Sequence, residues 1–174
     1  MARRLKLYAL FVGGEVEGGN IEVHDVRFVA APSLAATRPV LRRDWWGTPA
    51  SLHLDCWATL DHVDGYAVRL DATPFGGEER LFFVNLGGYV AGDFQEAHRN
   101  AFVAASNPID AKRRALATIA DWSDPHRDDL YDVDSVVALD TALAGQKVQI
   151  HLHPAPPARP LDFRCGYTPL GRKE

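Results

Sequence analysis

An approximate internal duplication is the feature of this sequence that most constrains its fold. Residues 7–31 and 81–105 align at a constant offset of 74, and 11 of the 25 aligned positions are identical. A shorter block follows at an offset of 73, where residues 53–63 align with residues 126–136. The blocks repeat the same polar residues and glycines in the same order: Gly13-Gly14/Gly87-Gly88, Glu22/Glu96, His24/His98, His53/His126 and Asp55/Asp128. The sequence therefore predicts two copies of one structural unit.

Hydrophobic patterning predicts two strands at the start of each copy, spanning residues 5–12, 23–31, 81–86 and 97–105. The leading strand of each copy is almost continuously apolar, which is typical of a strand buried on both faces, and we expect the glycine pair to end it. Alternation along the second strand places each histidine on the face that carries Phe28 or Phe102. We expect that face to point inward.

A helix is predicted after the second strand of each copy. In the second copy Asn107 can cap the helix, Pro108 fits its first position, and we expect it to run to about Trp122. In the first copy Ser33 occupies the equivalent cap position. Pro39 falls inside that helix, so we expect it to kink the helix or delay its start.

Further strands are predicted at residues 52–60, 66–70 and 147–153, with a hairpin turn at Asp64-Gly65. The expected fold is α+β, with two tandem β-β-α-β(β) repeats related by a pseudo-two-fold axis and mainly antiparallel sheet. The expected boundaries are residues 5–70 for the first repeat, 80–153 for the second repeat and 154–174 for a proline-rich C-terminal tail.

The tail carries an alternating apolar stripe at Leu161, Phe163, Cys165 and Tyr167. A disordered tail has little reason to carry such a stripe. We therefore expect an extended arm that packs on the chain itself or on a partner subunit of a homo-oligomer, with disorder as the alternative.

The composition excludes several classes of function. A net charge of −4 and an isoelectric point near 6.0 argue against nucleic-acid binding. Apolar runs are too short to cross a membrane, and the N-terminus lacks the pattern of a signal peptide. Cys56 and Cys165 have no CxxC spacing, and Cys56 lies on the apolar face of its strand, so we expect inert thiols and a cytoplasmic location.

The sequence resembles an uncharacterised bacterial family known as domain of unknown function 1543. The resemblance rests on the Gly-Gly…Glu-x-His…Phe-Val pattern, on FFVNLGGY at residues 82–89 and on DDLYDVD at residues 128–134. It covers most of residues 5–153 and excludes the tail. Members of that family carry one or two copies of the unit, which agrees with the duplication, and the resemblance implies no particular activity.

The strongest candidate for chemistry is the pair Glu22 and His24, because residues two apart on a strand project from the same face. His53 and Asp55 have the same spacing. If the fold brings both pairs together, they form a nitrogen-and-oxygen cluster suitable for a divalent metal such as zinc, manganese or iron. The alternative is structural, with each pair bracing the glycine loop through hydrogen bonds.

The equivalent residues of the second copy are candidates for acid–base or metal-assisted catalysis. They are Glu96, His98, His126 and Asp128.

Asn85 interrupts an otherwise apolar strand, and a buried amide there needs a partner from the protein or from a ligand. With Tyr89 and His98 it could line a small-molecule pocket present only in the second copy. The nearby glycines do not indicate a nucleotide site, since they match neither GxGxxG nor GK[ST].

Two hypotheses about function follow. The first is a non-catalytic scaffold that binds a small ligand or acts structurally, which we favour because no nucleophile, cofactor or substrate is fixed by the sequence. The second is a small metal-assisted or acid–base hydrolase or isomerase that uses the Glu-x-His and His-x-Asp pairs.

Overall fold

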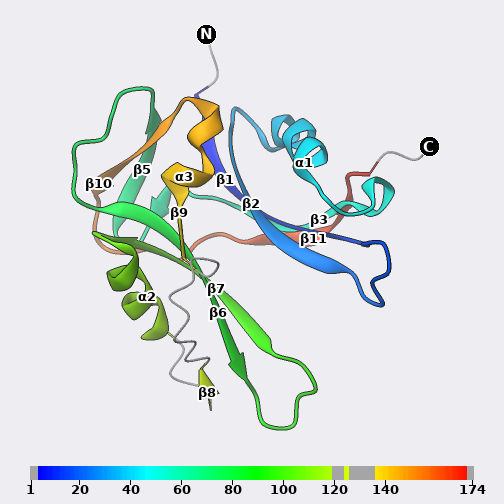
Figure 1. Ribbon diagram of the computed structural model, residues 1–174. Helices are drawn as coiled ribbons and strands as arrows, with labels where there is room; N and C mark the ends of the chain where they lie inside the picture. Colours follow the sequence, from blue (N-terminus) through cyan, green and yellow to red (C-terminus); the bar gives the residue numbers. More distant parts are fainter. Residues whose placement is uncertain (1–3, 119–123, 126–135, 172–174) are drawn as a thin grey trace. The chain divides into compact units, whose positions relative to one another are not determined.

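The computed structural model describes residues 4–118, 124–125 and 136–171. In those residues all strand pairs are antiparallel and the helices are few and short, so the α+β class is confirmed (Figure 1). The elements in chain order are β1 (Lys6–Gly14), β2 (Val23–Ala31), the 3-10 helix η1 (Leu34–Thr37), α1 (Arg38–Asp44), η2 (Pro49–Ser51), β3 (His53–Thr59), β4 (His62–Val63), β5 (Tyr66–Asp71), β6 (Arg80–Tyr89), β7 (Ala97–Ala105), α2 (Pro108–Leu116), β8 (Asp124–Pro125), β9 (Val136–Ala138), α3 (Leu139–Ala142), η4 (Ala144–Gln146), β10 (Gln149–Pro154) and β11 (Arg164–Pro169).

The chain divides into two compact units, of which the first joins Met1–Asp61 to Pro160–Glu174 and the second is His62–Arg159. These units are defined by contacts within the fold, whereas repeats are defined by internal similarity. The repeat boundaries at residues 5–70 and 80–153 therefore stay a prediction.

A single four-stranded sheet, in the order β11-β3-β1-β2, organises the first unit. One face of this sheet packs against α1 and the residues that follow it. The buried cluster on that face comprises Tyr8, Leu10, Val12, Val29, Ala31, Leu41, Trp45, Leu52, Leu54 and Leu170.

The prediction that the histidine faces of the second strands point into the core is wrong. The core faces of β2 and β7 carry small or β-branched residues, such as Val29, Ala31, Val103 and Ala105, and these pack under the helices. His24 and His98 occupy the opposite faces and are exposed. Small side chains lie on the helix side because they let the helix approach the sheet closely.

The expectation that the glycine pair ends the leading strand is confirmed for β1, whose last residue is Gly14, and is wrong for β6, which continues to Tyr89. Both pairs are themselves part of the strands. Gly13 and Gly14 pair with His24 and Val23 of β2, and Gly87 and Gly88 pair with His98 and Ala97 of β7. The glycines therefore serve for close approach of neighbouring groups, which is their other use in a strand.

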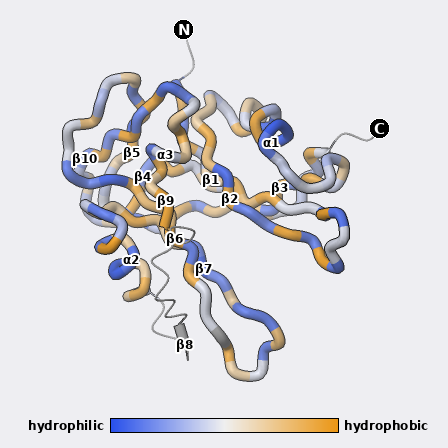
Figure 2. Tube along the Cα trace, viewed as in Figure 1, coloured by the Kyte–Doolittle hydropathy of each residue, from blue (hydrophilic) through white to orange (hydrophobic). Residues whose placement is uncertain are grey.

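The second unit contains a sheet in the order β10-β5-β4 and a sheet in which β7, β8 and β9 all pair with β6. Helix α2 covers one face of β6 and β7 through Ala111 and Ala115. The short strand β9 is hydrophobic along its length (Figure 2). The predicted turn at Asp64-Gly65 is confirmed, since both residues have positive φ angles (51° and 83°) between β4 and β5.

Both predicted helix caps are confirmed. The Ser33 side chain accepts a hydrogen bond from the Ala36 amide, and the Asn107 side chain accepts one from the Asp110 amide. Pro39 delays the regular helix, because a 3-10 turn precedes α1. Helix α2 ends at Leu116, and residues 119–123 of the predicted helix lie outside the described residues.

The two long hairpins have the same pairing register. Lys6 pairs with Ala31 in β1–β2, and Arg80 pairs with Ala105 in β6–β7, so each strand keeps the offset of 74 seen in the sequence. A duplication predicts that the two hairpins have the same internal register, as they do.

The C-terminal tail packs on the chain itself, which was one of the two expected placements. Strand β11 pairs with β3, and Leu170 is buried in the core of the first unit. Cys56 forms a disulfide with Cys165, so the expectation of inert free thiols is wrong, and it can no longer support a cytoplasmic location. The sequence missed this bond because the two cysteines become neighbours only when β11 joins the sheet. An oligomer formed through the tail stays a prediction.

Within the part of the chain that the structure describes, no helix is long and apolar enough to span a membrane.

Replacing both Cys56 and Cys165 by alanine should lower the free energy of unfolding by about 2–5 kcal/mol, because the crosslink closes a long loop in the unfolded chain. The two residues are 109 positions apart. Chemical denaturation without reductant measures the effect. As a control, a dithiol reductant should destabilise the wild-type protein and leave the double variant unchanged. Equal unfolding midpoints of the two proteins without reductant would contradict this prediction.

Candidate metal centre

Three strands of the first unit meet at Gly13 and bring two histidines together. Gly13 lies on the central strand β1 and pairs with His24 of β2 on one side and with His53 of β3 on the other. A Cβ atom at Gly13 would lie 2.7 Å from Nε2 of both histidines. The two imidazoles therefore extend over the glycine backbone into the space that a side chain would fill.

His53 is held in one orientation by its surroundings. It is only 3% exposed, and its Nδ1 lies 2.9 Å from the carbonyl oxygen of Ser51. A carbonyl oxygen only accepts, so Nδ1 carries a proton, and in the neutral form of the ring Nε2 has a free lone pair. The ring of Tyr167 from β11 packs against the imidazole at 4.7 Å.

Two carboxylates lie beside this lone pair. Nε2 of His53 is 3.3 Å from Oε2 of Glu22 and 3.2 Å from Oδ2 of Asp55. Oδ2 of Asp55 is also 3.2 Å from Nε2 of His24. The two pairs predicted from the sequence, Glu22/His24 and His53/Asp55, are therefore in contact.

Asp55 reaches this position through an irregularity in the sheet. Between Leu54 and Cys56 the register with β1 shifts by one residue, so Asp55 is the extra residue of a β-bulge. The register between β3 and β11 shifts at the same place. A bulge changes the direction of a side chain without interrupting the strand.

His24 completes the cluster on the solvent side. Its ring stacks on Phe11 with a centroid distance of 5.2 Å and an interplanar angle of 6°, which fixes the plane of the imidazole. Its side chain is 37% exposed, and that of Glu22, which precedes β2, is 51% exposed. The cluster is thus anchored by a buried histidine and open at Glu22 and His24.

The cluster has more acceptors than donors. Oδ2 of Asp55 is buried and accepts no hydrogen bond, and the lone pair of His53 faces two carboxylate oxygens. Buried acceptors facing one another are unfavourable, and either a proton on the imidazole nitrogen or a bound metal ion would relieve this. Donor atoms of Glu22, His24 and His53 all lie within 4.8 Å of one another.

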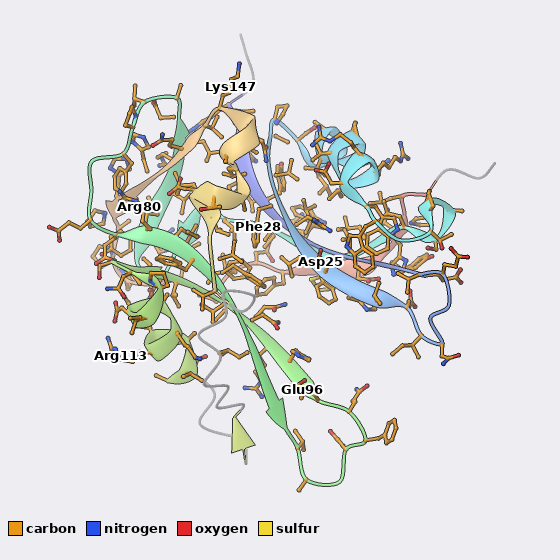
Figure 3. All side chains as sticks on the ribbon, in the orientation of Figure 1. Asp25, Phe28, Arg80, Glu96, Arg113 and Lys147 are labelled. Atoms are coloured by element: carbon orange, nitrogen blue, oxygen red, sulfur yellow. A yellow bond between two sulfur atoms is a disulfide. The ribbon has the colours of Figure 1, made fainter. Side chains whose placement is uncertain are left out.

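The second copy repeats part of this geometry. Gly87 pairs with His98, whose Nε2 is 3.6 Å from Oε2 of Glu96, the residue that Figure 3 labels on this hairpin. A Cβ atom at Gly87 would meet Oε1 of Glu96. His126 and Asp128, the other two candidates of this copy, lie outside the described residues.

The side-chain amide of Asn85 has a hydrogen-bond partner within the protein. Nδ2 of Asn85 donates to Oδ1 of Asn100, its direct neighbour on β7, at 2.7 Å. The side chain of Tyr89 lies outside the described residues, so the predicted pocket of Asn85, Tyr89 and His98 stays a prediction.

A surface hollow of about 410 Å³ lies on the first unit, between Pro39, Trp45 and Leu52. Its two arginines have partners already. Arg42 donates to the carbonyl of Leu170, and the hydrogen bond from Arg43 lowers the pKa of Asp44. The lining residues, Pro39, Arg42, Arg43, Trp45, Pro49 and Leu52, include no imidazole, thiol or carboxylate, so the hollow offers little for metal or acid–base chemistry.

Three groups that contribute to the centre were not predicted from the sequence. The first is Gly13 as the position between the two imidazoles, the second is the Ser51 carbonyl, and the third is Tyr167. A signal for the first was present, because Gly13 and His24 recur together as Gly87 and His98. The Ser51 carbonyl lies two residues before His53, but no residue type marks it in the sequence. The contact of Tyr167 depends on the pairing of β11 with β3, which no local pattern encodes.

Comparison with known proteins identifies the family. The model of the family called Domain of Unknown Function (DUF1543) matches residues 19–70. The crystal structure of a protein Il1583 from Idiomarina loihiensis is 34% identical, with a TM-score of 0.73, and the match covers 97% of this chain and 99% of that chain. The chain belongs to the DUF1543 family. The segment that matches the DUF1543 model contains all four residues of the cluster, Glu22, His24, His53 and Asp55. No significant match to a curated protein was found.

Substituting Gly13 by alanine should lower the free energy of unfolding by about 1–3 kcal/mol, because a new methyl group must displace two packed imidazoles. Thermal or chemical denaturation of the purified variant measures this change. Gly166→Ala is the matched control, since Gly166 lies on β11 of the same sheet and a Cβ atom there has no neighbour within 4 Å. If both variants unfold like the wild type, the close packing over Gly13 is refuted.

Proposed function

We propose that this DUF1543 protein is a scaffold that binds one divalent cation of the zinc class in its first repeat, through Glu22, His24 and His53. The observation that carries the proposal is the convergence of their donor atoms over Gly13, where no side chain competes for the space. The distances support it. Donor atoms around a tetrahedral ion with bonds of 2.0–2.1 Å are separated by about 3.3 Å. Nε2 of His53 and Oε2 of Glu22, two of the proposed donor atoms, are 3.3 Å apart.

The donor set favours a zinc-class ion over calcium or magnesium. Imidazole nitrogens suit zinc, copper, iron and nickel, whereas calcium and magnesium prefer oxygen ligands in larger numbers. The hydrogen bond from His53 Nδ1 to the Ser51 carbonyl also supports metal binding. Metal-binding histidines commonly donate their second ring nitrogen to such an acceptor, which fixes the tautomer and orients the ring.

A purely structural brace accounts less well for the same contacts. In a brace, the imidazole would donate a hydrogen bond from Nε2 to a carboxylate. His53 already uses its Nδ1 proton on Ser51, so it could also donate from Nε2 only as a charged imidazolium. Removing His24 distinguishes the two roles, because a brace contributes to the stability of the apo protein and a metal ligand does not.

We also propose that the chain consists of two tandem repeats related by a pseudo-two-fold axis. The matching registers of the two hairpins and the matching caps Ser33 and Asn107 support this proposal. The second repeat keeps the Glu-x-His pair at Glu96 and His98, together with His126 and Asp128 in the sequence. It is the candidate for a second, equivalent cation site.

In the apo protein, His24→Ala should leave the melting temperature close to that of the wild type and weaken zinc binding about 100-fold, because one of three ligands is lost. Isothermal titration calorimetry of the untagged protein measures the affinity. His153→Ala is the control, because His153 is an exposed histidine of the second unit. A strongly lowered melting temperature with unchanged zinc affinity would establish the brace instead.

Zinc affinity should fall between pH 7.5 and pH 5.5, because protons compete with the metal for its ligand atoms. The affinity falls toward low pH because a protonated imidazole has no free lone pair and repels a cation. Titrations at several pH values test this dependence, and His24→Ala should show a shallower one. An affinity that does not change over this range would exclude histidine ligands.

A further inference from the structure

We propose that the cation site is hydrolytic, with Asp55 as the residue that accepts a proton from water, and that its substrates are neutral carboxylic esters or amides. This inference rests on the proposed cation site. It adds a reaction, a role for Asp55 and a substrate class.

The ligand set leaves a position for water. The donor atoms that lie mutually within 4.8 Å come from two imidazoles and one carboxylate, and Asp55 is not a member of that group. Zinc sites with three protein ligands keep a water molecule in the fourth position and are catalytic, whereas structural zinc sites have four protein ligands. Two histidines and one glutamate form a ligand set of the catalytic type.

Asp55 is placed next to that position. Its Oδ2 is 3.2 Å from Nε2 of His24 and 3.2 Å from Nε2 of His53, so it is equally close to the two nitrogens that would hold the cation. The atom is buried and accepts no hydrogen bond from the protein. It can therefore accept one from a water molecule bound beside it. The β-bulge at Asp55 gives the carboxylate this direction.

The position is accessible from solvent. Glu22 and His24 have side chains that are 51% and 37% exposed, so a substrate can approach on their side while His53 anchors the site from within. Tyr167 is 68% exposed and its ring packs on His53. It offers an apolar surface for the acyl or aryl group of a substrate.

The charge of the site favours neutral substrates. Glu22 and Asp55 balance a divalent cation, and the loop after β1 adds the exposed carboxylates of Glu15 and Glu17. Arg27 of β2 lies on the opposite face of the strand from His24, where it is 2.6 Å from Asp25, and Arg164 is 3.2 Å from Asp162. A phosphate diester would meet net negative charge there, whereas an uncharged ester or amide would not.

The reaction balances with water alone. Water loses a proton to Oδ2 of Asp55, and its oxygen forms a bond to the carbonyl carbon of the substrate. The carbon–oxygen or carbon–nitrogen bond to the leaving group then breaks, and the leaving group takes the proton from Asp55. The products are a carboxylic acid and an alcohol or amine, and Asp55 is returned to its starting state.

The test uses the full chain loaded with one equivalent of zinc and two probes, p-nitrophenyl acetate and bis(p-nitrophenyl) phosphate. We expect hydrolysis of the acetate well above that of free zinc and of the apo protein, and little hydrolysis of the diester. Asp55→Asn should retain zinc affinity within about threefold and lose acetate hydrolysis by about 100-fold or more. Asp61→Asn is the matched control, because Asp61 is an exposed aspartate after β3, and it should change neither quantity.

Each of the other outcomes refutes one part of the proposal. If Asp55→Asn loses zinc, Asp55 is a fourth ligand and the position for water does not exist. If the wild type binds zinc and hydrolyses the acetate no faster than free zinc, the site is not hydrolytic, although the cation site stands. Faster hydrolysis of the diester refutes the substrate class. If no zinc binds, the proposed function fails and this inference fails with it.

Discussion

The pairing of β1 between β2 and β3 at Gly13 is the constraint on which the rest of the candidate centre depends. Gly13 lies on the central strand and has no side chain. The side chains of its two cross-strand partners, His24 and His53, can therefore extend over it toward each other. Any larger residue would push His24 and His53 apart, since both rings occupy the volume of its Cβ atom. The approach of the two imidazoles follows from this one absence of a side chain, and the β-bulge at Asp55 adds the carboxylate.

The two faces of the sheet in the first unit carry different residues where the candidate centre lies. On one face, aliphatic and aromatic residues pack under α1 and close the core of the first unit. The opposite face carries the polar cluster around His53 and also two buried apolar residues of β1, Leu7 and Ala9. Alternation along a strand makes this division possible, because neighbouring residues such as His53 and Leu54 point to opposite sides. None of the four polar residues of the cluster belongs to the apolar core under α1.

Local patterns predicted much of this fold, and tertiary pairing decided the rest. The bounds of β2 and β7, the turn at Asp64-Gly65 and the cap at Asn107 agree with the sequence because each depends on neighbouring residues. The candidate ligands were identified from their spacing alone. Which face is buried was predicted wrongly, because a phenylalanine was given more weight than the small residues on which the helices pack. The Cys56–Cys165 bond required knowing that β11 joins β3, and no local signal carries that information.

The first unit is built from two segments separated by the whole of the second, since Pro160–Glu174 joins Met1–Asp61. During synthesis on the ribosome, domains generally form from the N-terminus onward. Strands β1 to β3, with all four polar residues of the centre, emerge first, but the edge strand that carries Tyr167 emerges last. In the nascent chain, His53 is therefore present before the ring of Tyr167 that packs against it. The ring of Tyr167 can pack on His53 only after the whole of the second unit has been synthesised.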